Sequence, residues 1–192
     1  MIGIVSRAWR WLDGLFKNVS DFLLRVYIKK LERELMKGRM PKHIMIVADE
    51  NFLNRLQEFV RWCKKFGVEE LTVCVRRGEK KVETSLLNGV KVNYVIGYSG
   101  KDEIVDAVRE LARLVDKGVL KAEDVDEKVV ERFLKIRSSP DLIINVGDEI
   151  PEFLIWQSIY SELYFADISQ FRYVDFLRCL RDYQRRERRY GR

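Results

Sequence analysis

The sequence predicts an α/β fold with a mostly parallel central sheet flanked by helices. After residue 42, short apolar runs of strand length alternate with longer amphipathic stretches. This alternation is typical of parallel sheets that carry helices on both faces. The 192 residues are enough for one domain with a sizeable core. Hydrophobic residues make up 47% of the chain and charged residues 34%, a composition typical of folded globular proteins.

Residues 1–37 are predicted to form an N-terminal amphipathic helical region. Apolar residues recur at helical spacing from Val5 to Val26, with basic residues between them. Asn18 and Ser20 predict a break into two helices, with Ser20 as the cap of the second. Two interpretations stay open. The region packs on the domain, or it lies on a membrane surface or a partner, because Trp, Phe and Leu beside Lys and Arg suit that boundary.

The second predicted region is a domain of residues 38–192, which begins where Gly38 and Pro41 end the helical pattern. Its strands are expected at the apolar runs 43–49, 71–75, 90–97 and 141–147. Its helices are expected at 52–66, 101–117, 123–135, 152–162 and 173–189. No apolar run reaches the length of a membrane span, and the first is too short for a signal peptide.

Acidic residues follow two of the predicted strands. Asp49 and Glu50 come after the first strand, and Asp148 and Glu149 come after the fourth. Ligands of such sheets bind beyond the carboxyl ends of the strands, so both clusters are expected to face one crevice. His43, the only histidine, precedes a strand and is interpreted as structural.

The net charge of +6 comes largely from residues 185–192, RRERRYGR. Such an excess suits a phosphate ligand, an anionic membrane or nucleic acid, but no base-reading motif supports nucleic-acid binding. The cysteines, Cys63, Cys74 and Cys179, are widely spaced, which argues against a disulfide framework or a zinc site and favours a reducing compartment. We therefore expect a cytoplasmic protein, with peripheral membrane contact through its first helix left open.

Six segments resemble the cis-prenyltransferase family, the synthases of undecaprenyl and dehydrodolichyl diphosphate. They are KGRMPKHIMIVADEN, GYSGKDEIVDAVRELARLV, LKAEDVDEKVVERFL, SSPDLIINVGDE, FLIWQSIYSELYF and RRERRYG. On the family's pattern, Asp49 falls on the catalytic Asp, Asn51 on the Asn after it, and Glu162 on the Glu that helps to hold Mg²⁺. The resemblance implies a complex that condenses isopentenyl diphosphate with an allylic diphosphate, using Mg²⁺.

Several family features are missing. The basic, glycine-containing phosphate loop is absent, and Glu50 puts a carboxylate where a diphosphate should approach. Only a short stretch separates Val75 from the strand at 90–97, so the fold is expected to lack the helices that wall the family's product tunnel. Asn145 replaces an Arg, and the Arg and Ser that grip isopentenyl diphosphate fall in a gap near Ile150.

Other family features are retained. Arg189 and Gly191 fit the Arg-x-Gly motif that, in heteromeric enzymes, reaches across the dimer interface to the partner's diphosphate. An Arg makes strong, often bidentate contacts to phosphate, and a Gly lets the backbone come close. Trp156, Tyr160 and Tyr164 are expected on a helix in the family's dimer interface. This combination resembles the degenerate, Nogo-B-receptor-like subunit of the family.

We therefore predict a non-catalytic accessory subunit of a heteromeric cis-prenyltransferase. The chain would contribute the dimer interface and the Arg189 motif to isopentenyl diphosphate that is shared with a catalytic subunit, and that subunit would hold the Mg²⁺. In this interpretation Asp49 and Glu162 only support the fold. The alternative is a self-sufficient, homodimeric, short-product cis-prenyltransferase that uses Asp49 and Glu162 with Mg²⁺. A nucleic-acid module is a third, weaker interpretation.

Overall fold

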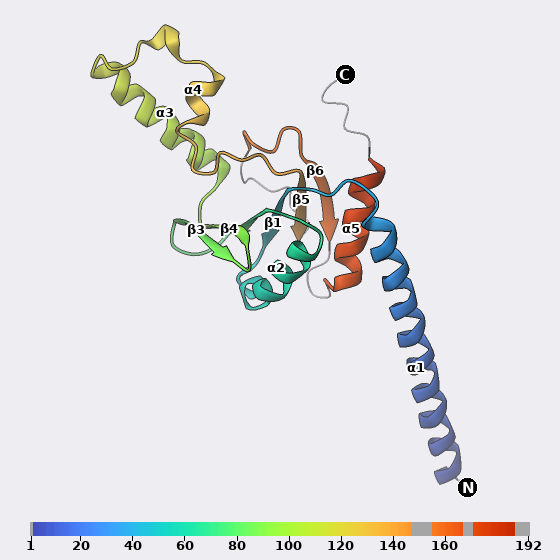
Figure 1. Cartoon of the computed structure of the whole chain (residues 1–192). Coiled ribbons are helices and arrows are strands. Elements are labelled where there is room, and N and C mark those ends of the chain that lie inside the picture. The colour runs from blue at the N-terminus through green and yellow to red at the C-terminus, as the bar shows by residue number, and fades with distance from the viewer. Residues whose placement is uncertain (1, 147–154, 167–170, 187–192) are drawn as a thin grey trace.

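The computed structural model describes residues 2–146, 155–166 and 171–186, with side chains from residue 19 onward. Six strands form one sheet in the order β3-β4-β2-β1-β5-β6 (Figure 1). The strands are β1 His43–Ala48, β2 Glu70–Val75, β3 Lys81–Leu87, β4 Val90–Ile96, β5 Leu142–Val146 and β6 Glu162–Ala166. The α-helices are α1 Ile2–Leu35, α2 Leu56–Lys65, α3 Gly100–Asp116, α4 Glu127–Glu131 and α5 Tyr173–Arg185. Two 3₁₀ helices, η1 Glu50–Arg55 and η2 Ala122–Asp124, complete the described elements.

The predicted fold class is confirmed, because every neighbouring pair of strands is parallel except β3 with β4. The central strands are buried on both faces, as their continuous apolar runs predict. Along β1, Ile44 and Ile46 join a large cluster that includes residues of α1, α2 and α5, whereas Met45 and Val47 join a smaller cluster on the other face. Helices therefore cover one face more fully than the other.

The β3–β4 hairpin was not predicted. Its turn consists of Asn88 and Gly89, both with positive φ, and this pair is a strong signal for a tight hairpin. The strand β3 was missed because it is largely exposed, and its residues carry little of the apolar pattern that reveals buried strands. The hairpin takes up the short stretch between Val75 and β4, where the family's tunnel helices were expected to be missing.

Two predicted helices were wrong in extent or type. Residues 155–160, expected in a helix over 152–162, form turns, and Glu162 begins β6. Tyr164 and Phe165 are good strand formers, and pairing with β5 satisfies backbone groups that the sheet edge leaves open. The helix expected over 123–135 shrinks to η2 and the short α4. The backbone after α4 instead bonds to the buried Glu103.

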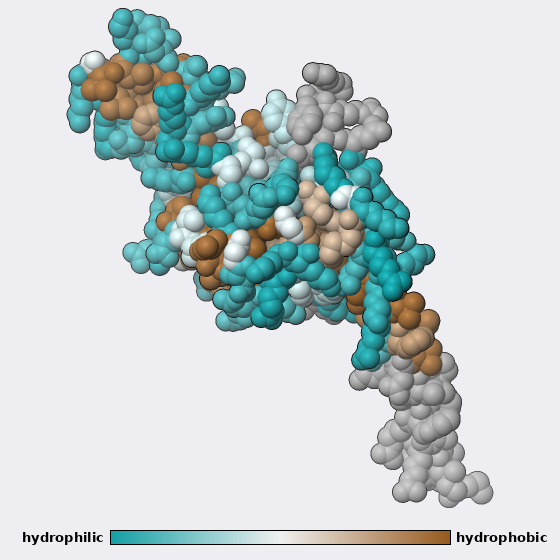
Figure 2. Space-filling view, in the orientation of Figure 1, coloured by the Kyte–Doolittle hydropathy of each residue, from teal (hydrophilic) through white to brown (hydrophobic). Residues whose placement is uncertain are grey.

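Helix α1 is continuous, so the break predicted at Asn18 and Ser20 is wrong. Its last turns pack on the domain, where Leu31 and Leu35 are buried and Glu32 bonds to Lys65 and Tyr173. The helix then extends away from the sheet (Figure 1). Where it leaves the domain, apolar side chains gather on its surface (Figure 2), and the exposed ones are Val19, Phe22, Leu23 and Val26. Among the described residues, no helix is long and apolar enough to cross a membrane.

Candidate active site

A pocket of about 430 Å³ opens at the carboxyl ends of β1, β2 and β5. Its lining residues come from these strand ends and the segments that follow them: Ala48, Asp49, Glu50, Asn51, Val75, Arg76, Arg77 and Val146. The expectation that Asp49 and Glu50 face a crevice at this edge is therefore confirmed. Asp148 and Glu149, the second predicted acidic cluster, lie outside the described residues, as do Arg189 and Gly191.

Asp49 caps η1. Its Oδ1 accepts a hydrogen bond from the backbone N–H of Phe52 at 3.3 Å, and its Oδ2 accepts one from Asn51 Nδ2 at 3.1 Å. The buried Phe52 ring anchors this turn in the core. The carboxylate remains exposed, and each of its oxygens has a further lone pair for a ligand. Asp49 therefore has the fold-supporting role considered for it, and its geometry also permits a binding role.

Arg76 and Arg77 are site residues that the sequence reasoning missed. They follow β2 as Asp49 follows β1, and that position directly after a buried strand could have revealed them. The turn that carries them packs closely on the end of β4, because a Cβ on Gly97 would lie 2.1 Å from the carbonyl oxygen of Gly78. Gly97 also has a φ of +57°, which favours glycine. The two glycines thus hold both arginines at the pocket.

The pocket lining combines two carboxylates, Asp49 and Glu50, with two guanidinium groups. The arginines therefore offset the repulsion that Glu50 alone would exert on a diphosphate. Mg²⁺ is usually held by one or two carboxylates together with substrate phosphates and water, so this donor set fits Mg²⁺. No cluster of three or more His, Cys, Asp or Glu side chains that could hold a metal occurs within the described ranges. Here the remaining ligands would have to come from substrate and water.

Glu162 lies far from this pocket. It begins β6 and is in register with Leu142, which is in register with Ile44 near the start of β1. Asp49 follows the end of β1, so the backbone positions of the two residues are separated by about 16 Å along the strand direction alone. Glu162 instead forms an ion pair with Arg186 at 3.0 Å. One chain therefore does not bring Asp49 and Glu162 to the same metal ion.

The three predicted interface residues differ in environment. Tyr160 is 63% exposed on the turn before β6, Trp156 is half-buried on that turn, and Tyr164 packs against the chain's own core. Because β6 is an edge strand, its outer side could pair or pack with another chain. Ile159 and Phe165, which the sequence reasoning did not single out, also expose large apolar side chains there.

Two other positions are structural. His43 is buried, and its Nε2 lies 2.8 Å from Thr72 Oγ1. Burial lowers the pKa of His43, which keeps the ring neutral. Asn145, at the position of a family Arg, is completely buried on β5 and does not line the pocket.

Comparisons with known proteins agree with this architecture. The family profile described as "Putative undecaprenyl diphosphate synthase" matches residues 75–191. The tritrans,polycis-undecaprenyl-diphosphate synthase (geranylgeranyl-diphosphate specific) of Methanocaldococcus jannaschii is 36% identical, over 97% of this chain and 71% of its own length. The synthase of the same name from Thermococcus kodakarensis is 30% identical, over 93% of this chain and 96% of its own.

A solved structure shares the fold. Lavandulyl diphosphate synthase from Lavandula x intermedia, in complex with dimethylallyl diphosphate, superposes with a TM-score of 0.68 at 20% identity. The superposition covers 80% of this chain and 99% of that one. The archaeal relatives and the profile match extend this likeness from the fold to the sequence. The chain therefore belongs to the cis-prenyltransferase family.

Proposed function

We propose that this chain is itself a cis-prenyltransferase, which works as a homodimer and extends an allylic diphosphate with isopentenyl diphosphate to a short polyprenyl diphosphate. The observation that carries the proposal is the pocket at the carboxyl edge, where Asp49 and Glu50 meet Arg76 and Arg77. The names of the archaeal relatives support this reaction class and favour geranylgeranyl diphosphate as the allylic substrate.

Each lining group has a role in this reaction. Arg76 and Arg77 would bind the diphosphate oxygens, because guanidinium groups make charge-assisted, often bidentate contacts to phosphate. Asp49 and Glu50 would hold Mg²⁺, which when bound offsets the negative charge of the leaving diphosphate. Asn51 holds the Asp49 carboxylate in place through its side-chain hydrogen bond. The allylic C–O bond breaks, the isopentenyl double bond supplies the electrons of the new C–C bond, and a proton is released.

We infer the homodimer from the position of Glu162. Because Glu162 is at the opposite edge of its own sheet from Asp49, only a second copy could bring a Glu162 side chain to the pocket. The exposed side chains Ile159, Tyr160 and Phe165 beside the edge strand β6 are the proposed contact surface. The product is proposed to be short because a β-hairpin, and not a pair of helices, joins β2 to the rest of the sheet.

A second candidate is the non-catalytic accessory subunit. Three observations favour it. Glu50 lines the pocket where a diphosphate would approach, and Asn145 is buried where the family has an Arg. The alignment with the Thermococcus kodakarensis relative also spans 257 positions, whereas this chain has 192 residues, so segments of that relative have no counterpart here. In this case a catalytic subunit would hold the Mg²⁺, and Arg189 and Gly191 would bind isopentenyl diphosphate in the partner's site.

A prenyl-transfer assay separates the two candidates. The purified full chain is incubated with Mg²⁺, geranylgeranyl diphosphate and labelled isopentenyl diphosphate, with and without a catalytic homologue from the same source. Products from the chain alone support the enzyme, and their length tests the proposed short product. The accessory subunit is supported if the chain alone forms no product and the mixture forms more product than the homologue alone. If the chain has no effect in either assay, both candidates are wrong.

A further inference from the structure

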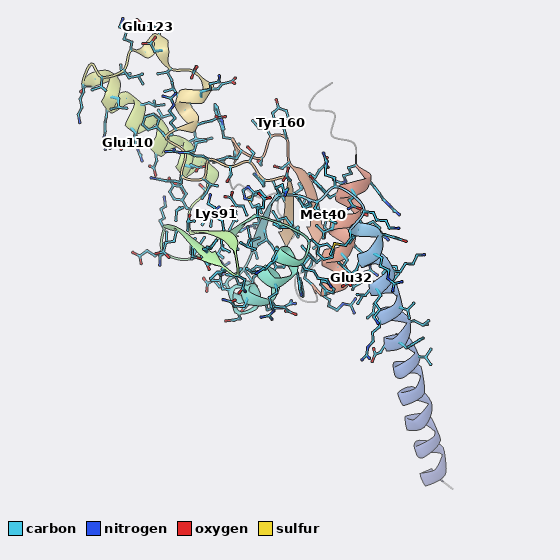
Figure 3. The ribbon with its side chains drawn as sticks, in the orientation of Figure 1. Glu32, Met40, Lys91, Glu110, Glu123 and Tyr160 are labelled. Carbon is cyan, nitrogen blue, oxygen red and sulfur yellow. The ribbon has the colours of Figure 1, made fainter. Side chains whose placement is uncertain are left out.

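A second, larger pocket of about 720 Å³ lies at the amino end of the sheet. Lys91 and Asn93, in the first half of β4, line one side, and Glu110 on α3 and residues 132–138 line the rest. Figure 3 labels Lys91 and Glu110 on the two elements that flank it. Strand β4 runs parallel to β2, and β2 to β1, so this pocket lies at the amino-terminal ends of the strands, whereas Asp49 lies at their carboxyl ends. It is therefore separate from the proposed active site.

The pocket lining is strongly basic. Four cations line it, namely Lys91, Arg132, Lys135 and Arg137, against the single carboxylate of Glu110. That carboxylate already forms an ion pair with Arg113, which is outside the pocket. The side chains of Arg132 and Lys135 have no ion pair or hydrogen bond to another residue in the described part of the chain. Lys91 is ion-paired with Glu70, and Lys135 is close enough to Asp106 to help lower the pKa of that carboxyl. The protein thus compensates the positive charge of this pocket only in part.

The floor of the pocket is a hydrogen-bonded polar network. Asn93, only 1% exposed, donates from Nδ2 to Glu70 Oε1 at 2.6 Å and accepts from Thr84 Oγ1 at 2.9 Å. Ser138 and Lys91 also donate to Glu70, at 2.6 and 3.0 Å. The charge of Glu70 is therefore spread over three donors beneath the pocket, and it does not exclude an anion above. Such a satisfied polar floor is rigid.

The wall over residues 132–138 is also held in place. Glu103, only 2% exposed, accepts from the backbone N–H groups of Lys135 and Ile136 at 2.7 and 3.2 Å. It also accepts from Gln157 Nε2 at 3.0 Å. The cations on this wall are thus carried by a backbone that is fixed before any ligand arrives, which lowers the entropic cost of binding. Phe133, half-buried in the same wall, adds an aromatic surface.

We propose that this pocket binds a small phosphate ester. The phosphate would lie on Arg132, Lys135 and Arg137, because arginine and lysine together favour phosphate oxygens. The organic part would lie against Phe133. The pocket has the volume typical of sites for small organic ligands, which is larger than inorganic phosphate needs. This second site goes beyond the proposed prenyl transfer and does not depend on it.

Calorimetric titration of the full chain tests the proposal, with ADP as the probe and pyrophosphate and citrate as comparison anions. The test variant is Arg132→Gln with Lys135→Gln. Its matched control is Lys117→Gln with Lys121→Gln, which removes the same charge from exposed positions outside the pocket. A third variant, Arg77→Gln, alters the pocket at the carboxyl edge. Circular dichroism confirms that each variant is folded.

We expect saturable ADP binding that is tighter than that of pyrophosphate or citrate. Loss of the two cations should weaken it about tenfold or more, whereas the control pair and Arg77→Gln should change it less than about threefold. Five results would overturn the proposal. Four concern the titrations above: no saturable binding of ADP; equal weakening by the control pair; pyrophosphate or citrate bound as tightly as ADP; or loss of binding in Arg77→Gln alone. A preference for nucleic acid with a steep salt dependence would also overturn it.

Discussion

Substitution of Asp49 separates its two roles, because it caps η1 and also lines the proposed active site. Asparagine caps a helix about as well as aspartate, so Asp49→Asn should change the free energy of unfolding by less than about 0.5 kcal/mol. Asp49→Ala removes the cap and should cost about 1 kcal/mol. The capping hydrogen bond is long, at 3.3 Å, so the cost is expected in the lower half of the usual range. Urea unfolding followed by circular dichroism measures both.

The activity of the same variants should differ from their stability. If Asp49 helps to hold Mg²⁺, both Asp49→Asn and Asp49→Ala lose transition-state stabilisation of several kcal/mol, and the rate of prenyl transfer falls about a hundredfold or more. The matched control is Asp126→Asn. Asp126 caps α4 by accepting from the Val129 N–H at 2.8 Å and is not part of the pocket, so this variant should keep full activity.

The decisive comparison is between Asp49→Asn and the unmodified chain in the same assay. Full activity in a folded Asp49→Asn variant would show that the carboxylate is only a cap, and our assignment of Asp49 to the reaction would then be wrong. If the Asp49→Asn variant is fully active only in a mixture with a catalytic homologue, the accessory-subunit interpretation explains this activity. Urea unfolding shows whether each variant is folded. This control is needed because a misfolded variant would lose activity whether or not Asp49 takes part in the reaction.

Three further predictions follow from other parts of the molecule. Phe22→Ser should weaken cosedimentation of the chain with anionic vesicles, while Val108→Ser, a similarly exposed apolar residue on α3, should not; equal effects would count against membrane contact by α1. Burial lowers the pKa of His43 from 6.5, so stability should fall as the pH drops below about 6.5, and His43→Gln should remove this dependence; an unchanged slope in urea unfolding would contradict it. The hydrogen bond from Lys80 lowers the pKa of Asp102 to about 2, so this stabilising contribution holds above about pH 4 and is lost towards pH 2. Lys80→Ala should raise that pKa in an NMR titration, and no shift would refute the assignment.

The sequence by itself determined the central strands and the family. Strands β1, β2 and β5 are largely apolar and buried, and a strand buried on both faces requires such a run. In β4, Lys91 and Asn93 interrupt the apolar residues, which are still frequent enough to reveal the strand. The position of Asp49 was also predictable, because a residue that directly follows a buried parallel strand must lie at the carboxyl edge. Local sequence patterns predicted the wrong secondary structure where contacts with the rest of the fold determine it. The stretch before Glu162 has helical spacing. Residues 162–166, which follow this stretch, form β6 because they pair with the open side of β5.

Only the tertiary structure decided which distant residues share a site. Arg76 and Arg77 line the same pocket as Asp49 because β1 and β2 are neighbours. Glu162 is excluded from this pocket because β6 starts at the amino-terminal end of the parallel strands. The basic pocket at the amino edge is likewise invisible in the sequence, since it forms where β4, α3 and the segment 132–138 converge. The physical reason is that chemistry depends on distances of a few ångströms, and pairing between strands far apart in the chain sets those distances.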